Sequence, residues 1–180
     1  MRVLEIGAGP GRFTIALAKL GCTVVVSDVS SVQLRLNEVH VKDAGAPGAV
    51  EGRHLLDVRD LSAFPDGTFD AVVAYGGPLS YVFEDAPTGL AECLRVTAPG
   101  GLVLASVMSL GGSGRFYVDT FLPAIDVVGV DEFDAFLQSG DQRALAAVPN
   151  IHPLPSVPPG LRPACPLSPD SGDGLSRGGT

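Results

Sequence analysis

A short glycine-rich turn is the first feature of the sequence that can do chemistry. Residues 2–6 are mostly apolar, and Gly7, Gly9 and Gly11 follow at alternating positions before a second apolar segment. Glycine permits positive φ angles and lets a ligand approach the backbone closely. Open α/β sheets bind ligands at the carboxyl ends of their strands. The turn therefore predicts a ligand-binding loop between a strand and a helix, and a tight turn that binds nothing is the alternative.

The spacing of these glycines separates the classes of ligand-binding loop. A dinucleotide-binding turn has the pattern G-x-G-x-x-G, in which the third glycine packs the helix on the strand. Here the pattern is G-x-G-x-G, and Arg12 stands where that third glycine belongs. No lysine stands at the position that a phosphate-binding P-loop requires. The spacing therefore disfavours an NAD(P)-dependent oxidoreductase and excludes a P-loop.

Two aspartates follow later strand-like segments. Residues 23–26 form a β-branched, apolar segment, and Asp28 closes the strand that it predicts. Asp28 lies 21 residues after Gly7. A carboxylate at this point can accept hydrogen bonds from both hydroxyls of a ribose, and the alternative is an acid that caps the next helix. Asp57 and Val58 follow a third strand-like segment. They can contact an adenine amino group and ring, or they can be an ordinary loop dipeptide.

The elements that must position these residues alternate between strand and helix. The expected strands are residues 2–6, 23–26, a segment ending near Leu56, 69–75 and 102–107. The expected helices are residues 13–20, a helix capped by Ser30 or Ser31 that carries Val32, Leu36 and Val39, and a helix around Leu90 and Leu94 that stops at residues 99–101. This alternation is typical of βαβ units. The sequence therefore predicts an α/β fold with a Rossmann-like, doubly wound, mostly parallel sheet.

Four stretches within the first 108 residues resemble a known family. They read VLEIGAGPG, VVVSDVS, LLDVRDLSAFPDGTFDAVVAYGGPLSYV and LRVTAPGGLVLASV. In order and spacing they resemble the class I S-adenosylmethionine (SAM) dependent methyltransferases, especially the small-molecule group that includes ubiquinone- and menaquinone-type enzymes. The resemblance implies S-adenosyl-L-methionine as the cofactor and methyl transfer to an unidentified small molecule. A catalytically silent SAM-binding protein is the alternative.

The resemblance also implies a role for each motif. The glycine turn would pass under the methionine part and the ribose of SAM, and Glu5 would organise that turn and the methionyl amino group. Asp28 would hold the ribose hydroxyls, and the residues around Asp57 would form the adenine pocket. The segment after the fourth strand would border the methionine end and face the acceptor. The implied cofactor-binding residues are Glu5, Gly7, Ala8, Gly9, Gly11, Asp28, Val29, Asp57, Val58, Ala74, Tyr75 and Gly76.

Methyl transfer from SAM needs no dedicated catalytic dyad. SAM carries its methyl group on a sulfonium cation, and a dry pocket that aligns the nucleophile supplies most of the catalysis by positioning. Tyr75, Tyr81 and His152 are candidates for contact with the acceptor, and each can instead be a pocket wall or an exposed residue. The sequence assigns no catalytic base.

The organisation changes after the fifth expected strand. We expect residues 1–110 to form the SAM-binding core, residues 111–148 a helical cap or substrate region, and residues 149–180 an irregular tail rich in proline and glycine. The tail has no helix or strand period, so it is expected to be disordered. Compared with the family, the chain is expected to be truncated at both ends, without the first helices and the last strands. The chain is expected to be a SAM-dependent methyltransferase that binds SAM weakly by itself, and the sequence leaves its activity without the missing segments open.

Composition limits the partners of the chain. The net charge is −8 and no run of Lys or Arg occurs, so electrostatics favour neither nucleic acid nor an anionic membrane as a partner. Three cysteines at wide spacings, without a C-x-x-C motif, argue against a disulfide framework and a metal site. No signal peptide or bilayer-length apolar stretch is visible. A cytoplasmic protein is expected, and the sequence does not determine its oligomeric state.

Overall fold

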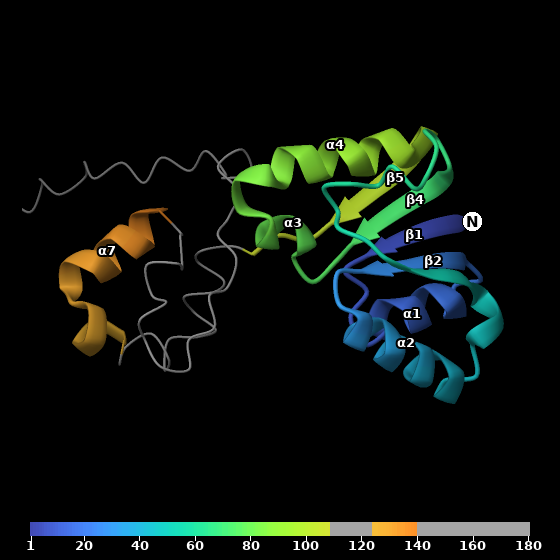
Figure 1. Cartoon of the computed structure of the whole chain (residues 1–180), viewed down its shortest axis with the longest axis horizontal. Helices are drawn as coiled ribbons and strands as arrows, with labels where there is room; N and C mark the ends of the chain where they lie inside the picture. The colour runs from blue at the N-terminus through green and yellow to red at the C-terminus, as the bar shows by residue number, and fades with distance from the viewer. Residues whose placement is uncertain (109–123, 140–180) are drawn as a thin grey trace, which may run out of the picture.

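Five parallel strands form a single sheet in the computed structural model, which describes residues 1–108 and 124–139 (Figure 1). Their order across the sheet is β3-β2-β1-β4-β5. The chain therefore starts in the centre and extends the sheet first to one side and then to the other, which is the doubly wound arrangement. The predicted Rossmann-like α/β fold is confirmed. The strands are β1 (Arg2–Ile6), β2 (Thr23–Asp28), β3 (Val50–Leu55), β4 (Phe69–Ala74) and β5 (Thr97–Ala105).

Helices cover both faces of this sheet. Figure 1 shows α1 (Arg12–Lys19) and α2 (Ser31–Asp43) on one face, and α3 (Pro78–Tyr81) and α4 (Ala86–Val96) on the other. The central strands β1, β2 and β4 are consequently buried on both sides. A strand in this position must be apolar along its whole length, which is why all three are nearly continuous runs of buried residues. Two short 3-10 turns complete this region, η1 (Pro47–Ala49) and η2 (Phe83–Asp85).

Successive residues of the central strands fill two separate cores. Leu4 of β1 and Val72 of β4 belong to a buried cluster with residues of α4. Their neighbours Val3 and Val73 pack on the opposite face, against Leu17 of α1. This alternation follows from the two-residue period of a β-strand. The ends of β1 and β4 are therefore held from both sides, and they form a rigid base for the turns that follow them.

The apolar stripe expected on α2 does not face the core. Val32, Leu36 and Val39 are exposed, while Asn37 and Val41 are buried. The sequence pattern identified the helix but not its inner face. The reason is that the inner face carries a buried polar residue whose hydrogen bonds are satisfied inside the protein, and such a residue breaks the apolar period.

The sequence indicated the end of the third strand but not its start. The expected strand ended near Leu56, whereas β3 runs over Val50–Leu55 and ends before that residue. β3 pairs with β2 alone among the described strands and is only partly buried. A strand at the edge of a sheet needs no continuous apolar run, so its sequence VEGRHL shows no strong strand pattern.

The fifth strand also begins earlier than expected. α4 ends at Val96 and β5 starts at Thr97, so residues 99–101 lie within the strand and do not terminate the helix. The pairing between β4 and β5 is interrupted by a register shift at this point. Proline and glycine are tolerated in a strand where such a bulge occurs. Pro99, Gly100 and Gly101 therefore mark a bulge here and not a turn.

Further helical residues lie outside the sheet region, at 124–128 and in a longer helix that follows. α7 (Val130–Ser139) falls within residues 111–148, the segment that was expected to form a helical cap. Its role as a cap remains a prediction. The expected tail at residues 149–180, including His152, lies outside the described residues. Within residues 1–108 and 124–139, no helix has the length and apolarity needed to cross a membrane.

Candidate cofactor-binding site

The turn after β1 places its glycines in the left-handed region of backbone conformation. Gly7, Gly9 and Gly11 have φ angles of 65°, 53° and 99°, which residues with a side chain rarely adopt. A Cβ atom on Gly7 would lie 3.1 Å from Cβ of Pro78, so this glycine lets two turns approach each other. A Cβ atom on Gly9 would meet no atom within 4 Å. The backbone at Gly9 is therefore open to a ligand.

Asp28 joins this glycine turn to the end of β2. Its Oδ2 accepts a hydrogen bond from the N–H of Gly9 at 2.9 Å, and its Oδ1 accepts one from the N–H of Ser30 at 2.8 Å. Asp28 is only 7% exposed. Ser30, and not Ser31 or Asp28, caps α2, because its side-chain oxygen accepts a hydrogen bond from the N–H of Gln33. The alternative reading of Asp28 as a helix cap is therefore wrong.

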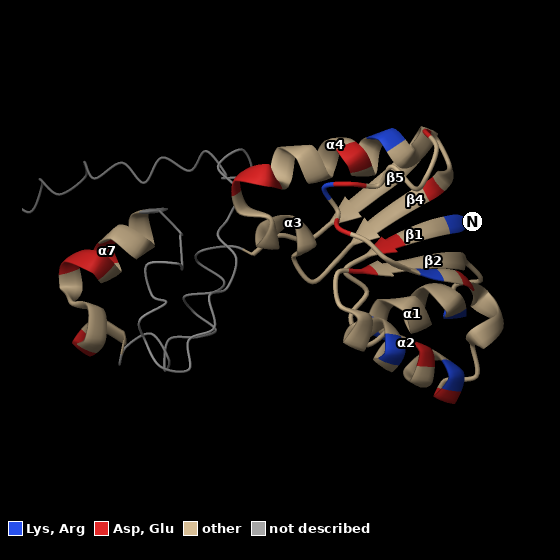
Figure 2. Cartoon of the chain, in the orientation of Figure 1, with Lys and Arg blue, Asp and Glu red and all other residues tan. Residues whose placement is uncertain are grey.

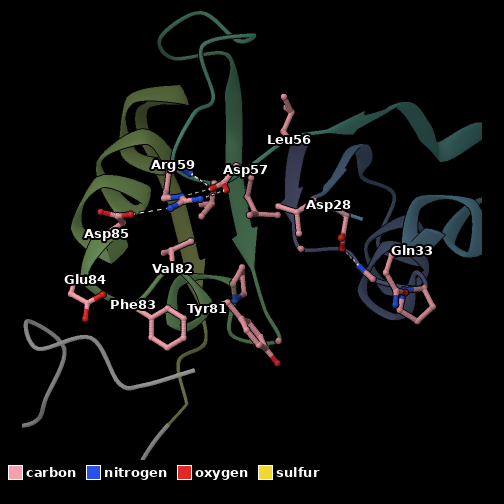
Figure 3. Close-up of a pocket in the computed structure, with 18 residues that line it drawn as sticks. Asp28, Gln33, Leu56, Asp57, Arg59, Tyr81, Val82, Phe83, Glu84 and Asp85 are labelled. Carbon is pink, nitrogen blue, oxygen red and sulfur yellow. Dashed lines mark hydrogen bonds and ion pairs between the residues drawn. The ribbon is translucent and has the colours of Figure 1, made fainter. Parts of the chain in front are cut away.

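A pocket of about 720 Å³ opens at the carboxyl ends of the strands (Figure 3). The turns after β1, β2, β3 and β4 form its wall together with α3 and η2. This is the edge at which doubly wound sheets bind ligands. Tyr81, one of the expected acceptor-side residues, also lines the pocket. The expected cofactor-binding residues that line it are Gly7, Gly9, Asp28, Val29, Asp57, Val58 and Gly76.

Other expected residues lie behind this wall. Ala8 and Ala74 are buried in the two cores. Tyr75 packs edge-to-face on Phe13 of α1, with ring centroids 5.2 Å apart. It therefore lies on the α1 face of the sheet and not at the pocket, where it was expected to face the acceptor. The expected residues outside the pocket wall are Glu5, Ala8, Gly11, Ala74 and Tyr75.

Several wall residues were missed by the sequence analysis. They are Gln33, Arg59, Val82, Phe83, Glu84 and Asp85. Oε1 of Gln33 is a buried acceptor without a hydrogen-bond partner. Phe83 has a φ of 50°, the one positive value for a non-glycine residue in the described part of the chain, and such strain often occurs at functional sites. Neither signal can be read from residue spacing.

Arg59 organises the part of the pocket around Asp57. Asp57 Oδ1 accepts hydrogen bonds from the Arg59 N–H at 2.9 Å and from Nε at 3.0 Å, and Oδ2 accepts one from Nη2 at 2.7 Å. The guanidinium also bonds Asp85 of η2 at 2.9 Å (Figure 3). These bonds to Arg59 lower the pKa of Asp57. Asp57 is therefore a fixed, ionised acceptor next to Val58, which is buried.

The pocket is acidic. Its wall contains the carboxylates of Asp28, Asp57, Glu84 and Asp85 and the single cation of Arg59. Figure 2 shows acidic residues at the end of β2 and directly before α4, on the same edge of the sheet. A site with this balance of charge attracts a cationic ligand and repels an anionic one.

Glu5 lies on β1 beneath the glycine turn. It is 2% exposed, and its Oε2 accepts a hydrogen bond from Oγ1 of Thr14 at 2.6 Å. Its Oε1 is buried without a hydrogen-bond partner. Burial raises the pKa of Glu5 from 4.5 to about 7, against the opposing effect of the Thr14 hydrogen bond. Glu5 therefore changes its charge near neutral pH.

Replacing Glu5 with glutamine is expected to change how stability depends on pH. The folded protein retains a proton on Glu5 up to a pKa of about 7, whereas the unfolded chain releases it near 4.5. The wild-type free energy of unfolding is therefore expected to fall, relative to E5Q, as the pH rises from 4.5 to 7, by up to about 3 kcal/mol. Urea unfolding of both proteins between pH 4.5 and 8 measures this. Parallel pH profiles would contradict it.

The comparison with known protein families identifies this sheet and pocket. The family profile described as "Methyltransferase domain" matches residues 3–101, which is more than half of the chain. The chain belongs to this methyltransferase domain family. The matched range contains every residue of the pocket wall, so the family match and the geometry concern the same site.

Relatives of this methyltransferase domain include quinone-pathway enzymes by name. The ubiquinone biosynthesis O-methyltransferase of Thiobacillus denitrificans is 28% identical over 152 residues, which cover 81% of this chain and 62% of that protein. The demethylmenaquinone methyltransferase of Mycolicibacterium gilvum is 33% identical over 158 residues, which cover 81% of this chain and 64% of that protein. The chain therefore spans about three fifths of the length of these relatives.

Solved structures with a similar fold have different names. A putative SAM-dependent methyltransferase from Methanococcus maripaludis has a TM-score of 0.53 at 21% identity, over 81% of this chain and 67% of that chain; this likeness shows the fold alone. The [4+2]-cyclase SpnF has a TM-score of 0.50 at 28% identity, over 57% of this chain and 37% of that chain. The architecture of the methyltransferase domain is thus found in a protein named for cyclisation as well.

Proposed function

We propose that this methyltransferase domain binds SAM in the pocket described above and transfers the methyl group to a small molecule. One observation carries the proposal. The buried carboxylate of Asp28 holds the glycine turn through Gly9 and lines the same pocket as Asp57. A nucleoside that lies across these strand ends meets open backbone at one end and two carboxylates along its length, which is the contact pattern that an adenosine requires.

The polar atoms of the wall fit an adenosine. Asp28 would accept hydrogen bonds from the ribose hydroxyls, and Val29 would lie beside the adenine. Asp57 would accept a hydrogen bond from the adenine amino group, and Val58 would contact the ring.

The charge of the wall favours SAM over a dinucleotide. SAM carries a sulfonium cation and an ammonium group, and both are attracted by a wall with four carboxylates and one guanidinium. The pyrophosphate of NAD carries two negative charges and would be repelled by the same wall. The glycine spacing already disfavours NAD, and the family match gives the oxidoreductase alternative no support.

The residues of this chain would contribute positioning more than acid–base chemistry. Bound SAM supplies a methyl group on a positively charged sulfur. The glycine turn and Pro78 would hold the methionine part, while the apolar residues around Val58 exclude water from the adenine. An acceptor held in line with the methyl group gains its rate from alignment in a dry site.

The acceptor would lie beside α3 and η2. Tyr81, Phe83 and Glu84 line the pocket on the side away from Asp28 (Figure 3). Two aromatic side chains offer flat apolar surface for an aromatic ring. Together with the names of the quinone-pathway relatives, this makes an aromatic, quinone-type ring the first acceptor to test.

Calorimetric titration of this chain with SAM and with NAD tests the binding step. Heat of binding with SAM and none with NAD is expected. The reverse result would overturn the proposal. Transfer of a labelled methyl group from SAM to demethylated quinone precursors tests the reaction. Binding of SAM without transfer to these precursors or to a metabolite extract would favour the catalytically silent alternative.

A further inference from the structure

A chain of hydrogen bonds runs through the interior from β3 to β1. Nε of Arg53 donates to Oδ1 of Asn37 at 3.0 Å, and Nδ2 of Asn37 donates to Oγ1 of Thr14 at 2.8 Å. Oγ1 of Thr14 then donates to Oε2 of Glu5 at 2.6 Å. Asn37 and Thr14 are both 0% exposed. Four residues on β3, α2, α1 and β1 are thus connected, and the chain ends under the glycine turn.

Arg53, at the start of the chain of hydrogen bonds, determines the direction of every bond that follows. A guanidinium has donors and no acceptor, so Arg53 must meet the carbonyl oxygen of the Asn37 amide. The amide nitrogen of Asn37 must then face Thr14, whose hydroxyl oxygen accepts its proton. The single O–H of Thr14 is consequently free to point at Glu5. A series of donors that ends on a carboxylate stabilises the ionised form of that carboxylate.

Gly11 makes room for this chain. A Cβ atom on Gly11 would lie 3.2 Å from Nδ2 of Asn37 and 3.4 Å from Cγ2 of Val41. Glycine is therefore required at position 11, because the buried side-chain amide of Asn37 on α2 lies directly against the turn there. The expected contact of Gly11 with the cofactor remains a prediction, while its contact with the interior is given by the packing.

We propose that Thr14, Asn37 and Arg53 are positioning residues that orient Glu5 under the cofactor turn and favour its ionised form. This inference rests on the proposed binding of SAM. The donor chain acts against the burial of Glu5 and against the negative charge of Asp28 on β2, the other charged group that acts on Glu5. From α1 and α2 the neighbouring groups are the neutral Thr14 and Asn37, and on β4 the paired residue is an uncharged valine.

As a consequence, the affinity for SAM would depend on Thr14, Asn37 and Arg53, although these residues do not contact SAM. An ionised Glu5 attracts the cationic methionine end of SAM through the glycine turn, and a neutral Glu5 does not. Loss of the Thr14 hydroxyl removes its hydrogen bond to Oε2. The carboxyl group then binds its proton more tightly, and cofactor affinity at neutral pH falls.

Titration of the ligand-free protein tests the first half of this inference. Side-chain carboxyl ¹³C NMR of glutamate-labelled protein reports the protonation of Glu5. Thr14→Val is expected to raise the pKa of Glu5 from about 7 to about 8 or above, and Asn37→Leu to raise it less. Thr14→Ser, which keeps the hydroxyl, is expected to resemble the wild type. Thr23→Val, at an exposed position at the start of β2, is the matched control.

The pH profile of SAM affinity tests the second half. At pH 7 a pKa near 8 leaves about a tenth of Glu5 ionised, so Thr14→Val is expected to weaken SAM binding about five-fold. The affinity is expected to recover at pH 9. An unchanged pKa in Thr14→Val overturns the inference, as does a weakened affinity that is the same at every pH. If the wild type binds no SAM, the proposed function fails, while the ligand-free titration still decides whether the donor chain controls Glu5.

Discussion

Replacing Asp28 with alanine is expected to lower the affinity for SAM about 100-fold. Hydrogen bonds to a charged group contribute about 1.5–3 kcal/mol each, and the variant loses the proposed bonds to the ribose hydroxyls. It also loses the bond from Gly9 that holds the glycine turn. A net loss of about 2.7 kcal/mol corresponds to that factor of 100. Isothermal titration with SAM at constant pH and salt measures the change.

Two further variants separate binding from folding in this experiment. Asp28→Asn keeps one side-chain oxygen for the turn but loses the charge, so a smaller loss of about ten-fold is expected. Asp43→Asn, at the exposed end of α2, removes the same charge away from the pocket and is expected to bind as the wild type does. Thermal unfolding checks that each variant is folded. Full affinity in a folded Asp28→Ala protein would refute the ribose role.

Replacing Gly101 with alanine is expected to destabilise the protein by about 1–3 kcal/mol, the range for overpacking at a site without space for added atoms. A Cβ atom at this position would lie 2.7 Å from the backbone oxygen of Asp70 and 2.9 Å from that of Ala98. These atoms belong to the bulge between β4 and β5 and cannot rotate away as the end of a side chain can. Urea unfolding followed by circular dichroism measures the difference in the free energy of unfolding.

Gly48→Ala is the matched control for this substitution. Gly48 lies in η1, and a Cβ atom there would meet no atom within 4 Å. The loss of unfolded-state entropy is then expected to leave stability unchanged or to raise it by about 0.4–1 kcal/mol. Equal stabilities of the two variants would mean that the bulge between β4 and β5 relaxes easily, which would contradict the packing described for Gly101.

The sequence by itself determined the central part of the fold. Helices cover both faces of β1, β2 and β4. Each of these strands must therefore be a continuous run of apolar residues, which can be recognised in the sequence. The glycine turn could also be recognised, because a left-handed backbone conformation favours glycine at positions 7, 9 and 11. Asp28 and Asp57 could be placed beside this turn, since parallel strands end at the same edge of a sheet. The family resemblance rested on these same residues and was confirmed.

The edges of the sheet could not be predicted with the same accuracy. β3 is only partly buried, so its start leaves no apolar signature. β5 contains a proline and two glycines, which in most sequences mark a turn, and here they form a bulge. On α2 the apolar residues that follow the helical period are exposed, whereas the inner face contains the buried polar residue Asn37. In each case a tertiary contact overrode the local pattern.

Only the tertiary structure decided which other side chains complete the site. Arg59 joins Asp57, in the same loop, to Asp85 of η2, and the four-residue donor chain to Glu5 spans β3, α2, α1 and β1. Local periodicity reports the face on which a residue lies, because it arises from the repeat of a single helix or strand. It carries no information about the partner that a polar side chain finds across the interior. That partner is set by how the elements pack, and here the packing brings Asn37 against Gly11 and Thr14.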